Sequence, residues 1–339
     1  GPVSFAPVIF EDFSCYAMSA KEPRQAFDPA LIRQWNGPVP DGDQFLLLDT
    51  CLAPLEDAQR FWRRWREQCD FYHESSVSHE LASLAVLRLG ERAGNCSIAL
   101  RSMGLFRRSW FLSELAMQSA ARIAEVALTD VGPLLVRGDL AMKLLGPSFE
   151  GRAFPVRSLR FAVAPRARGQ QILLAEREKL AAAKLRTNLI RIEVSPAARW
   201  MMEVSQAAPD PYTNLRVLPL PLMLADLVAS NWRWGPPGGL RWVLELVMAM
   251  EQAPDPDALA TAVVDASIRL GSVPALQAAT EIFSYLSAGQ VFETLRLRLR
   301  GVPTSRRSRW RLKAITASPV SWQHRSLRML DQLSFRLNG

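Results

Sequence analysis

The sequence predicts an α+β protein that is mainly helical, with a small mixed β-sheet between N-terminal and C-terminal helical regions. Apolar residues recur every three or four positions over long stretches on both sides of the centre, which is the period of amphipathic helices. Short apolar or alternating runs gather between residues 131 and 220, which favours strands there. Hydrophobic residues make up 49% of the 339 residues and charged residues 22%, so the chain has the composition of an ordinary globular protein.

The same patterns divide the chain into regions. Residues 1–41 contain several prolines and little periodicity, which predicts an extended arm. Residues 42–130 form a predicted helical N-terminal region, and residues 131–220 form an α/β core. Residues 221–300 form a helical C-terminal region, and residues 301–339 follow as a basic tail.

Amphipathic helices are predicted along the N-terminal region. In LEDAQRFWRRWREQ, residues 55–68, Trp62 and Trp65 fall on one side with other apolar residues at spacings of three and four. HELASLAVLRLGERAG, residues 79–94, is a second helix that ends at a glycine. The long periodic stretch over residues 97–128 predicts one extended helix.

The centre of the prediction is VGPLLVRGDLAMKLLG, residues 131–146. Its apolar run predicts a buried strand, Arg137-Gly138-Asp139 a tight turn, and the apolar period that follows a helix. A strand, a glycine turn and a helix can hold a phosphate, because free backbone amides at a helix N-terminus attract anions. Asp139 works against such a site, since an aspartate there is expected to cap the helix and to repel phosphate.

Further strands are predicted at VRSLRFAV (156–163), at the alternating NLIRIEV (188–194) and at LRVLPL (215–220). Residues 164–184 are rich in helix formers and predict a covering helix. RWMMEVS, residues 199–205, is predicted to extend the sheet or to lie beside it. Together these segments form a small mixed sheet with a covering helix.

Aromatic and basic residues cluster at the start of the C-terminal region. They are Trp232, Arg233, Trp234, Arg241 and Trp242. One interpretation is core packing between helices. The other is a ligand groove lined by these side chains.

The tail over residues 301–339 is strongly basic. From Arg296 onward, eleven Lys or Arg residues stand against the single acid Asp331, so this end accounts for the whole net charge of +8. Trp322 and the leucines after it lie near one helical face, which predicts a basic amphipathic helix. The tail would pack on the chain's own acidic surface, dock an acidic protein partner, or bind a membrane surface or nucleic acid. No motif resembles a sequence-specific nucleic-acid reader, and the oligomeric state stays open.

The sequence also bears on the cellular compartment. No apolar run reaches the roughly 18 residues of a membrane-spanning helix, and no leader with a charged and an apolar part opens the sequence. We therefore expect a cytoplasmic protein. Cys15, Cys51, Cys69 and Cys96 are widely spaced, which predicts free thiols in a reducing compartment.

Several segments in a fixed order carry a family resemblance. FLLLDTCLAPLEDAQRFWRRWREQCD (45–70) has paired tryptophans, and LLVRGDLAM (134–142) has a leucine-rich strand with a glycine. PPGGLRWVLEL (236–246) has an Arg-Trp pair followed by an acid, Glu245. From about residue 45 to residue 286 the chain resembles the uncharacterised bacterial nucleotidyltransferase family. The resemblance implies a minimal nucleotidyltransferase core between two helical regions.

The resemblance also implies where a metal site would lie. In that family, two aspartates one residue apart on a strand and a third carboxylate on a neighbouring strand bind divalent metal. In this chain, Ser158 and Arg160 occupy the positions of the family's paired aspartates, and Glu193 occupies the position of the third carboxylate. Because a guanidinium cannot ligate magnesium and brings its own positive charge, we expect no metal there. An Arg160–Glu193 ion pair is expected in its place.

From this resemblance we expect a nucleotidyltransferase-fold protein without metal-dependent catalysis and without a cofactor. It would serve as a binding or scaffolding partner in a bacterial biosynthetic or export pathway. The alternative is a divergent transferase that uses magnesium and a nucleoside triphosphate. In that case Arg137, Gly138 and Arg160 would position the nucleotide, and Glu193 or Asp139 would supply the carboxylate. A third reading is an anion site without turnover.

Overall fold

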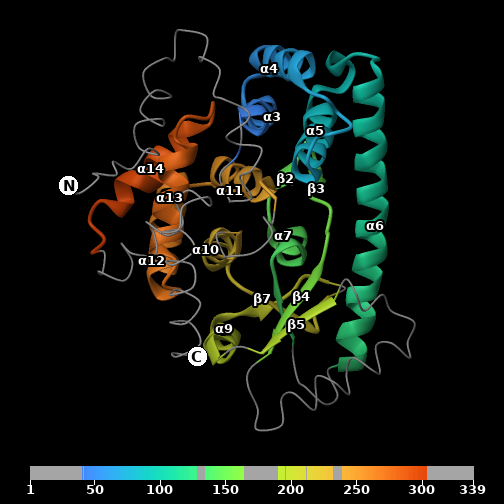
Figure 1. Cartoon of the computed structure of the whole chain (residues 1–339). Coiled ribbons are helices and arrows are strands. Elements are labelled where there is room, and N and C mark those ends of the chain that lie inside the picture. The colour runs from blue at the N-terminus through green and yellow to red at the C-terminus, as the bar shows by residue number, and fades with distance from the viewer. Residues whose placement is uncertain are drawn as a thin grey trace, which may run out of the picture.

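The structure is a computed structural model, shown in Figure 1. It describes residues 40, 42–127, 134–163, 190–194, 196–210, 212–231 and 239–303. The helix predicted over residues 164–184 lies outside this part of the chain. So do nearly all of the predicted arm and the tail beyond residue 303.

The predicted N-terminal helices are confirmed. They are α3 (Gly42–Leu52), α4 (Leu55–Gln68), α5 (Ser76–Leu89) and α6 (Ser97–Ala127), with the short 3-10 helix η1 (Gly90–Ala93) after α5. In α4, Trp62 and Trp65 are buried and stacked with their ring centroids 5.1 Å apart. Helix α5 begins three residues earlier than expected, because Ser75 caps it by accepting a hydrogen bond from the Ser78 amide.

The predicted core is a mixed five-stranded sheet. Its strands are β1 (Leu134–Arg137), β4 (Leu159–Val163), β5 (Ile190–Val194), β6 (Gln206–Ala207) and β7 (Leu215–Val217), in the order β5-β4-β1-β7-β6. Strand β1 pairs antiparallel with β4 and parallel with β7, and β4 pairs parallel with β5. The expected strand, turn and helix are present, since Gly138 at φ +61° joins β1 to α7 (Asp139–Leu145).

In the core, one of two alternatives is confirmed and one element was not predicted. Residues 199–205 do not extend the sheet, but most of them belong to the helix α9 (Pro196–Val204), which lies beside the sheet and contacts β1 and β4. A hairpin of β2 (Ser148–Phe149) and β3 (Arg152–Ala153) turns through two residues with positive φ. Strands of two residues are too short to show a period of two, so the sequence pattern could not indicate them.

The C-terminal region is helical as predicted. It contains α10 (Leu220–Asn231), α11 (Arg241–Glu251), α12 (Pro256–Arg269), α13 (Val273–Phe283) and α14 (Gly289–Leu299). Figure 1 shows α12 to α14 on one side of the molecule and the long helix α6 on the other, with the sheet between them. The described chain is thus mainly helical with a small mixed sheet.

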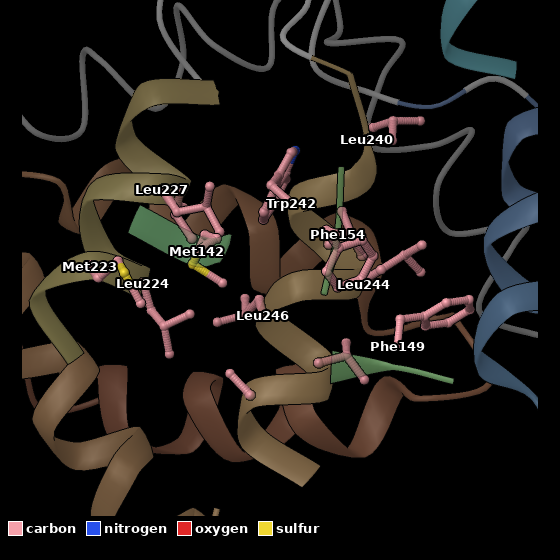
Figure 2. Packing of buried hydrophobic residues seen from close by; sticks show 14 of the residues in the cluster. Met142, Phe149, Phe154, Met223, Leu224, Leu227, Leu240, Trp242, Leu244 and Leu246 are labelled. Atoms are coloured by element: carbon pink, nitrogen blue, oxygen red, sulfur yellow. The ribbon is translucent and has the colours of Figure 1, made fainter. Parts of the chain in front are cut away.

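One continuous hydrophobic core connects these regions. Its buried residues come from α3 to α6, from the sheet and α7, and from α10 to α14. Figure 2 shows Trp242 and Leu246 of α11 facing Met142 of α7 and Leu227 of α10. The regions predicted over residues 42–130, 131–220 and 221–300 therefore share one core in the described part of the chain.

Two further findings concern the cysteines and the membrane. Cys51, Cys69 and Cys96 are free, as predicted. Among the helices that the structure describes, none combines the length and the apolar character needed to cross a membrane.

Candidate functional site

The predicted anion-binding residues meet where β1 ends and α7 begins. Arg137 lies opposite Arg160 in the antiparallel β1–β4 pair. A Cβ atom on Gly138 would lie 3.5 Å from Cδ and 3.7 Å from Nη1 of Arg160, so this side chain packs over the glycine turn. The structure therefore brings Arg137, Gly138, Asp139 and Arg160 together, as the sequence predicts.

Arg137 is engaged by a carboxylate that the sequence analysis did not select. Its Nε donates a 3.0 Å hydrogen bond to Asp226 Oδ2, and its Nη2 donates to Oδ1 of the same residue. Both side chains are buried, and Asp226 belongs to α10. A two-pronged, desolvated arginine–carboxylate pair is a strong interaction, and it balances the positive charge of Arg137 inside the fold.

Asp139 does not cap α7, which corrects the prediction. Its carboxylate accepts hydrogen bonds from Arg157 at the backbone N (3.2 Å), Nε (2.9 Å) and Nη2 (3.1 Å). Arg241 Nη2 also lies 2.8 Å from Asp139 Oδ1. Burial alone would raise the pKa of Asp139, but the charges of Arg157 and Arg241 bring it well below its usual range.

Arg241 lies at the centre of a wider cluster of charges. It is 1% exposed and donates to Glu245 Oε1 (3.0 Å), Glu80 Oε1 (3.2 Å) and the carbonyl oxygen of Pro155 (2.6 Å). Arg157 Nη1 donates to the other oxygen of Glu80 at 2.9 Å. We call Glu80, Asp139, Arg157, Arg241 and Glu245 the ion-pair cluster.

The ion-pair cluster has three carboxylates and two guanidinium groups. Glu245 is almost completely buried, so the excess negative charge affects its pKa most directly. Burial raises the pKa of Glu245 first, and the nearby charges of Asp139 and Glu80 raise it further against the effect of Arg241. The protonated form of Glu245 is therefore favoured more than that of an exposed glutamate.

The groove interpretation fails for the two candidates that the structure describes. Arg241 belongs to the ion-pair cluster, and Trp242 is 2% exposed. The ring of Trp242 meets that of Phe283 edge to face, with centroids 5.3 Å apart, so it is a core residue. Trp232, Arg233 and Trp234 lie outside the described residues.

The positions at which the resemblance expects metal-binding carboxylates lie on and beside β4 and β5. Ser158 precedes β4, and Arg160 stands opposite Arg191 of β5. Glu193 stands opposite Ala162, and its side chain lies outside the described part of the structure. The Arg160–Glu193 ion pair stays a prediction. Within the described residues, no group of three or more His, Cys, Asp or Glu is placed to hold a metal ion.

Three residues of these ion pairs were not predicted from the sequence: Glu80, Arg157 and Asp226. Arg241 and Glu80 are 161 positions apart, and Arg137 and Asp226 are 89 apart. No local pattern indicates partners at such separations. Only Arg241 with Glu245 has a local signal, since residues four apart are neighbours on a helix.

The arrangement is suited to holding parts of the chain together. The ion-pair cluster joins α5, α7, the segment before β4, and α11, while the Arg137–Asp226 pair joins β1 to α10. Comparison of the chain with family models, with curated proteins and with solved structures gave no match. The family resemblance therefore depends on the sequence segments alone.

Proposed function

We propose that this chain is a non-catalytic binding or scaffolding protein whose core resembles that of a nucleotidyltransferase. The observation that carries the proposal is the pairing of the charges at the β1–α7 turn with one another. Arg137 is bound by Asp226, and Asp139 is bound by Arg157 and Arg241. In a nucleotide site, the same positions would leave cationic groups and backbone amides facing a phosphate.

The free energies favour the ion pair between Arg137 and Asp226 over the binding of a phosphate by Arg137. Breaking a buried ion pair by removing one partner costs about 3–5 kcal/mol. A ligand held at micromolar affinity gains about 8 kcal/mol in total. A phosphate that displaced Asp226 from Arg137 would therefore lose about half of that gain before it made any other contact.

Calorimetric titration of the full chain with ATP, with and without magnesium, tests the proposal. We expect no saturable binding up to about 1 mM ATP, which is a binding free energy of about 4 kcal/mol. Magnesium-dependent binding in the micromolar range would overturn the proposal in favour of the divergent transferase. Metal-independent binding would overturn it in favour of an anion site.

A variant that frees Arg137 from its carboxylate serves as a comparison if the natural chain binds no ATP. Asp226→Asn keeps the size of the side chain but removes the charge that balances Arg137. We expect this variant to gain weak, salt-sensitive binding of ATP or pyrophosphate that the natural chain lacks. If the natural chain binds as well as the variant, then Asp226 does not close the site.

The binding role requires a partner. The net charge of the tail supports an acidic protein as one partner, because residues 301–339 carry most of the excess of Lys and Arg. Contact of the same tail with an anionic membrane surface is the competing possibility. Removing residues 304–339 is expected to abolish tail-mediated binding and to leave the described fold intact.

A further inference from the structure

Helix α6 presents an apolar stripe to solvent. The stripe consists of Leu100, Gly104, Arg107, Phe111 and Leu115, which follow one another at intervals of four, three, four and four residues. Residues with this spacing lie along one side of a helix. Leu100 is 65% exposed and Phe111 is 60% exposed. We call these five residues the α6 stripe.

The α6 stripe lies on the side of the helix away from the protein. Phe106, Ser113 and Ala120 are buried and occupy the opposite side of the same helix. The hydroxyl of Ser113 accepts a hydrogen bond from the Val156 amide at 2.8 Å, which fixes that side against the segment before β4. Figure 1 shows α6 along an outer edge of the molecule. Large apolar side chains exposed along one side of a helix make that side a candidate interaction surface.

The stripe and its surroundings on α6 carry basic side chains. Arg101, Arg107, Arg108 and Arg122 are exposed on α6. No carboxylate of the described residues forms an ion pair with Arg107 or Arg108. A second copy of the same helix would bring these charges against each other, and the basic tail of this chain carries the same sign. Charge complementarity therefore indicates an acidic partner.

Gly104 indicates that the partner is a helix. A glycine inside an exposed helix costs about 1 kcal/mol relative to alanine, so it calls for a reason. The described part of the chain offers none, because a Cβ on Gly104 would meet nothing there within 4 Å. Small residues let two helix backbones approach closely, and Gly104 lies within the stripe between Leu100 and Phe111.

We propose that the α6 stripe binds an acidic amphipathic helix of another protein, which crosses α6 at Gly104. Leucine or similar side chains of that helix cover Leu100, Phe111 and Leu115, and its carboxylates face Arg107 and Arg108. This inference deepens the proposed binding role and rests on it. It places the partner on α6, apart from the tail and from the ion-pair cluster.

The test uses the full chain and a designed probe. The probe is a fluorescent helical peptide of about 21 residues, the length of a 30 Å helix, with leucines on one side, glutamates on both flanks and an alanine at the centre. A second peptide with lysine in place of each glutamate is the control. Fluorescence anisotropy should show saturable binding of the acidic peptide at least about tenfold tighter than that of the basic peptide.

Variants locate the binding on the stripe. Phe111→Ser should weaken binding about tenfold, as loss of a central aromatic contact does. Leu297→Ser removes an apolar side chain that is also about half exposed but lies on α14, and it should leave binding unchanged. The double variant Arg107→Glu/Arg108→Glu should reverse the preference toward the basic peptide. An unchanged affinity of the Phe111→Ser variant would overturn the proposal.

Gly104→Leu separates a helix partner from a membrane. The substitution fits the helical backbone and the open space, and it should raise the melting temperature. It should weaken peptide binding by blocking the close approach, whereas an added leucine would strengthen partition onto vesicles of anionic phosphatidylglycerol. Stronger vesicle binding with no peptide binding would overturn the proposal. So would self-association in sedimentation that Phe111→Ser abolishes. Neither result affects the ATP titration, so the proposed function is tested independently.

Discussion

Two buried arginines, Arg137 and Arg241, hold their charges against carboxylates from distant parts of the chain. A buried ion pair adds little net stability compared with an apolar pair, but breaking one by removing a partner is costly. The main effect of these pairs is therefore to hold chain segments in place, and they add little net stability. They connect the β1–α7 turn to α10, to α11 and to the segment before β4.

Arg137→Met tests the pairing with Asp226. The variant leaves the Asp226 carboxylate buried without its cation, so the free energy of unfolding should fall by about 3–5 kcal/mol. The double variant Arg137→Met/Asp226→Leu should recover most of this loss, because two apolar side chains can pack in place of the pair. Urea unfolding measures both values. A double variant no more stable than the single one would show that Arg137 acts through another contact.

The backbone conformation and the neighbouring side chains both favour glycine at position 239. Its φ is +87°, and a Cβ there would lie 2.6 Å from Arg157 Nη1 and 3.1 Å from Glu80 Oε2. Gly239→Ala should therefore lower the free energy of unfolding by about 1–3 kcal/mol. The matched control Gly104→Ala, in a helix with open space, should raise it by about 0.5–1 kcal/mol. Equal effects of the two substitutions in urea unfolding would contradict this account.

Glu245 gives the stability a pH dependence of defined sign. Because burial raises its pKa above the ordinary value of 4.5, the folded chain binds this proton more tightly than the unfolded chain does. The contribution of this group is greatest below pH 4.5 and falls as the pH rises through the folded pKa. Glu245→Gln imitates the protonated acid, so its stability relative to the natural chain should increase as the pH rises above 4.5.

The control for this measurement is Glu293→Gln. Glu293 is exposed, and a hydrogen bond from Arg296 lowers its pKa, so its effect has the opposite sign. Thermal unfolding at a series of pH values gives both comparisons. A relative stability of Glu245→Gln that is flat, or that falls with pH, would mean that Glu245 is ionised at little cost in the fold.

Among the helices and strands, the features that depend on residues close in sequence were predicted. The glycine at the end of α5, the apolar face of α4 and the strand-turn-helix at Gly138 all follow from residues within one or two turns of each other. The segment of α9 was expected to extend the sheet or to lie beside it, and the second alternative holds; its helical form was not predicted, although Pro196 at its first position is a recognised helix-start signal. The β2–β3 hairpin was missed because Glu150 adopts φ +51°, which glutamate rarely does.

The start of α6 predicts an unusually reactive cysteine. Cys96 Sγ accepts hydrogen bonds from the Ala99 amide at 3.5 Å and from Arg66 Nη1 at 3.0 Å. Burial alone would raise its pKa, but these hydrogen bonds and the charge of Arg66 bring it below the ordinary 9.0. Burial raises the pKa of Cys51 to about 12. Since the thiolate is the reactive form, iodoacetamide should alkylate Cys96 at least about tenfold faster than Cys51 at neutral pH.

Peptide mass spectrometry resolves the two rates. Arg66→Met should slow the alkylation of Cys96 and leave Cys51 unaffected. Faster reaction of Cys51, or a Cys96 rate that Arg66→Met leaves unchanged, would contradict an effect of the hydrogen bond from Arg66 on the Cys96 thiol.

For the whole molecule, the sequence predicted a mainly helical fold with a small mixed sheet, and it grouped four candidate residues without indicating their partners. Arg137, Gly138, Asp139 and Arg160 were selected together, and the structure places them together. The partners Asp226 and Arg157 could not be predicted, because they come from other elements that tertiary packing brings near. A charge pattern gives candidates for a site, whereas the tertiary fold decides whether they face a ligand or each other.

The ion-pair cluster connects the N-terminal and C-terminal helical regions. Arg241 of α11 contacts Glu80 of α5 and Asp139 of α7, so Arg241→Met should weaken elements far apart in the sequence at once. Hydrogen exchange should show faster exchange in both α5 and α11, by roughly a hundredfold for a loss of about 3 kcal/mol. Arg298→Met, which removes a surface pair with Asp257, is the matched control and should change neither helix. If α11 loosens while α5 keeps its protection, the N-terminal and C-terminal regions are stabilised separately and the cluster does not couple them.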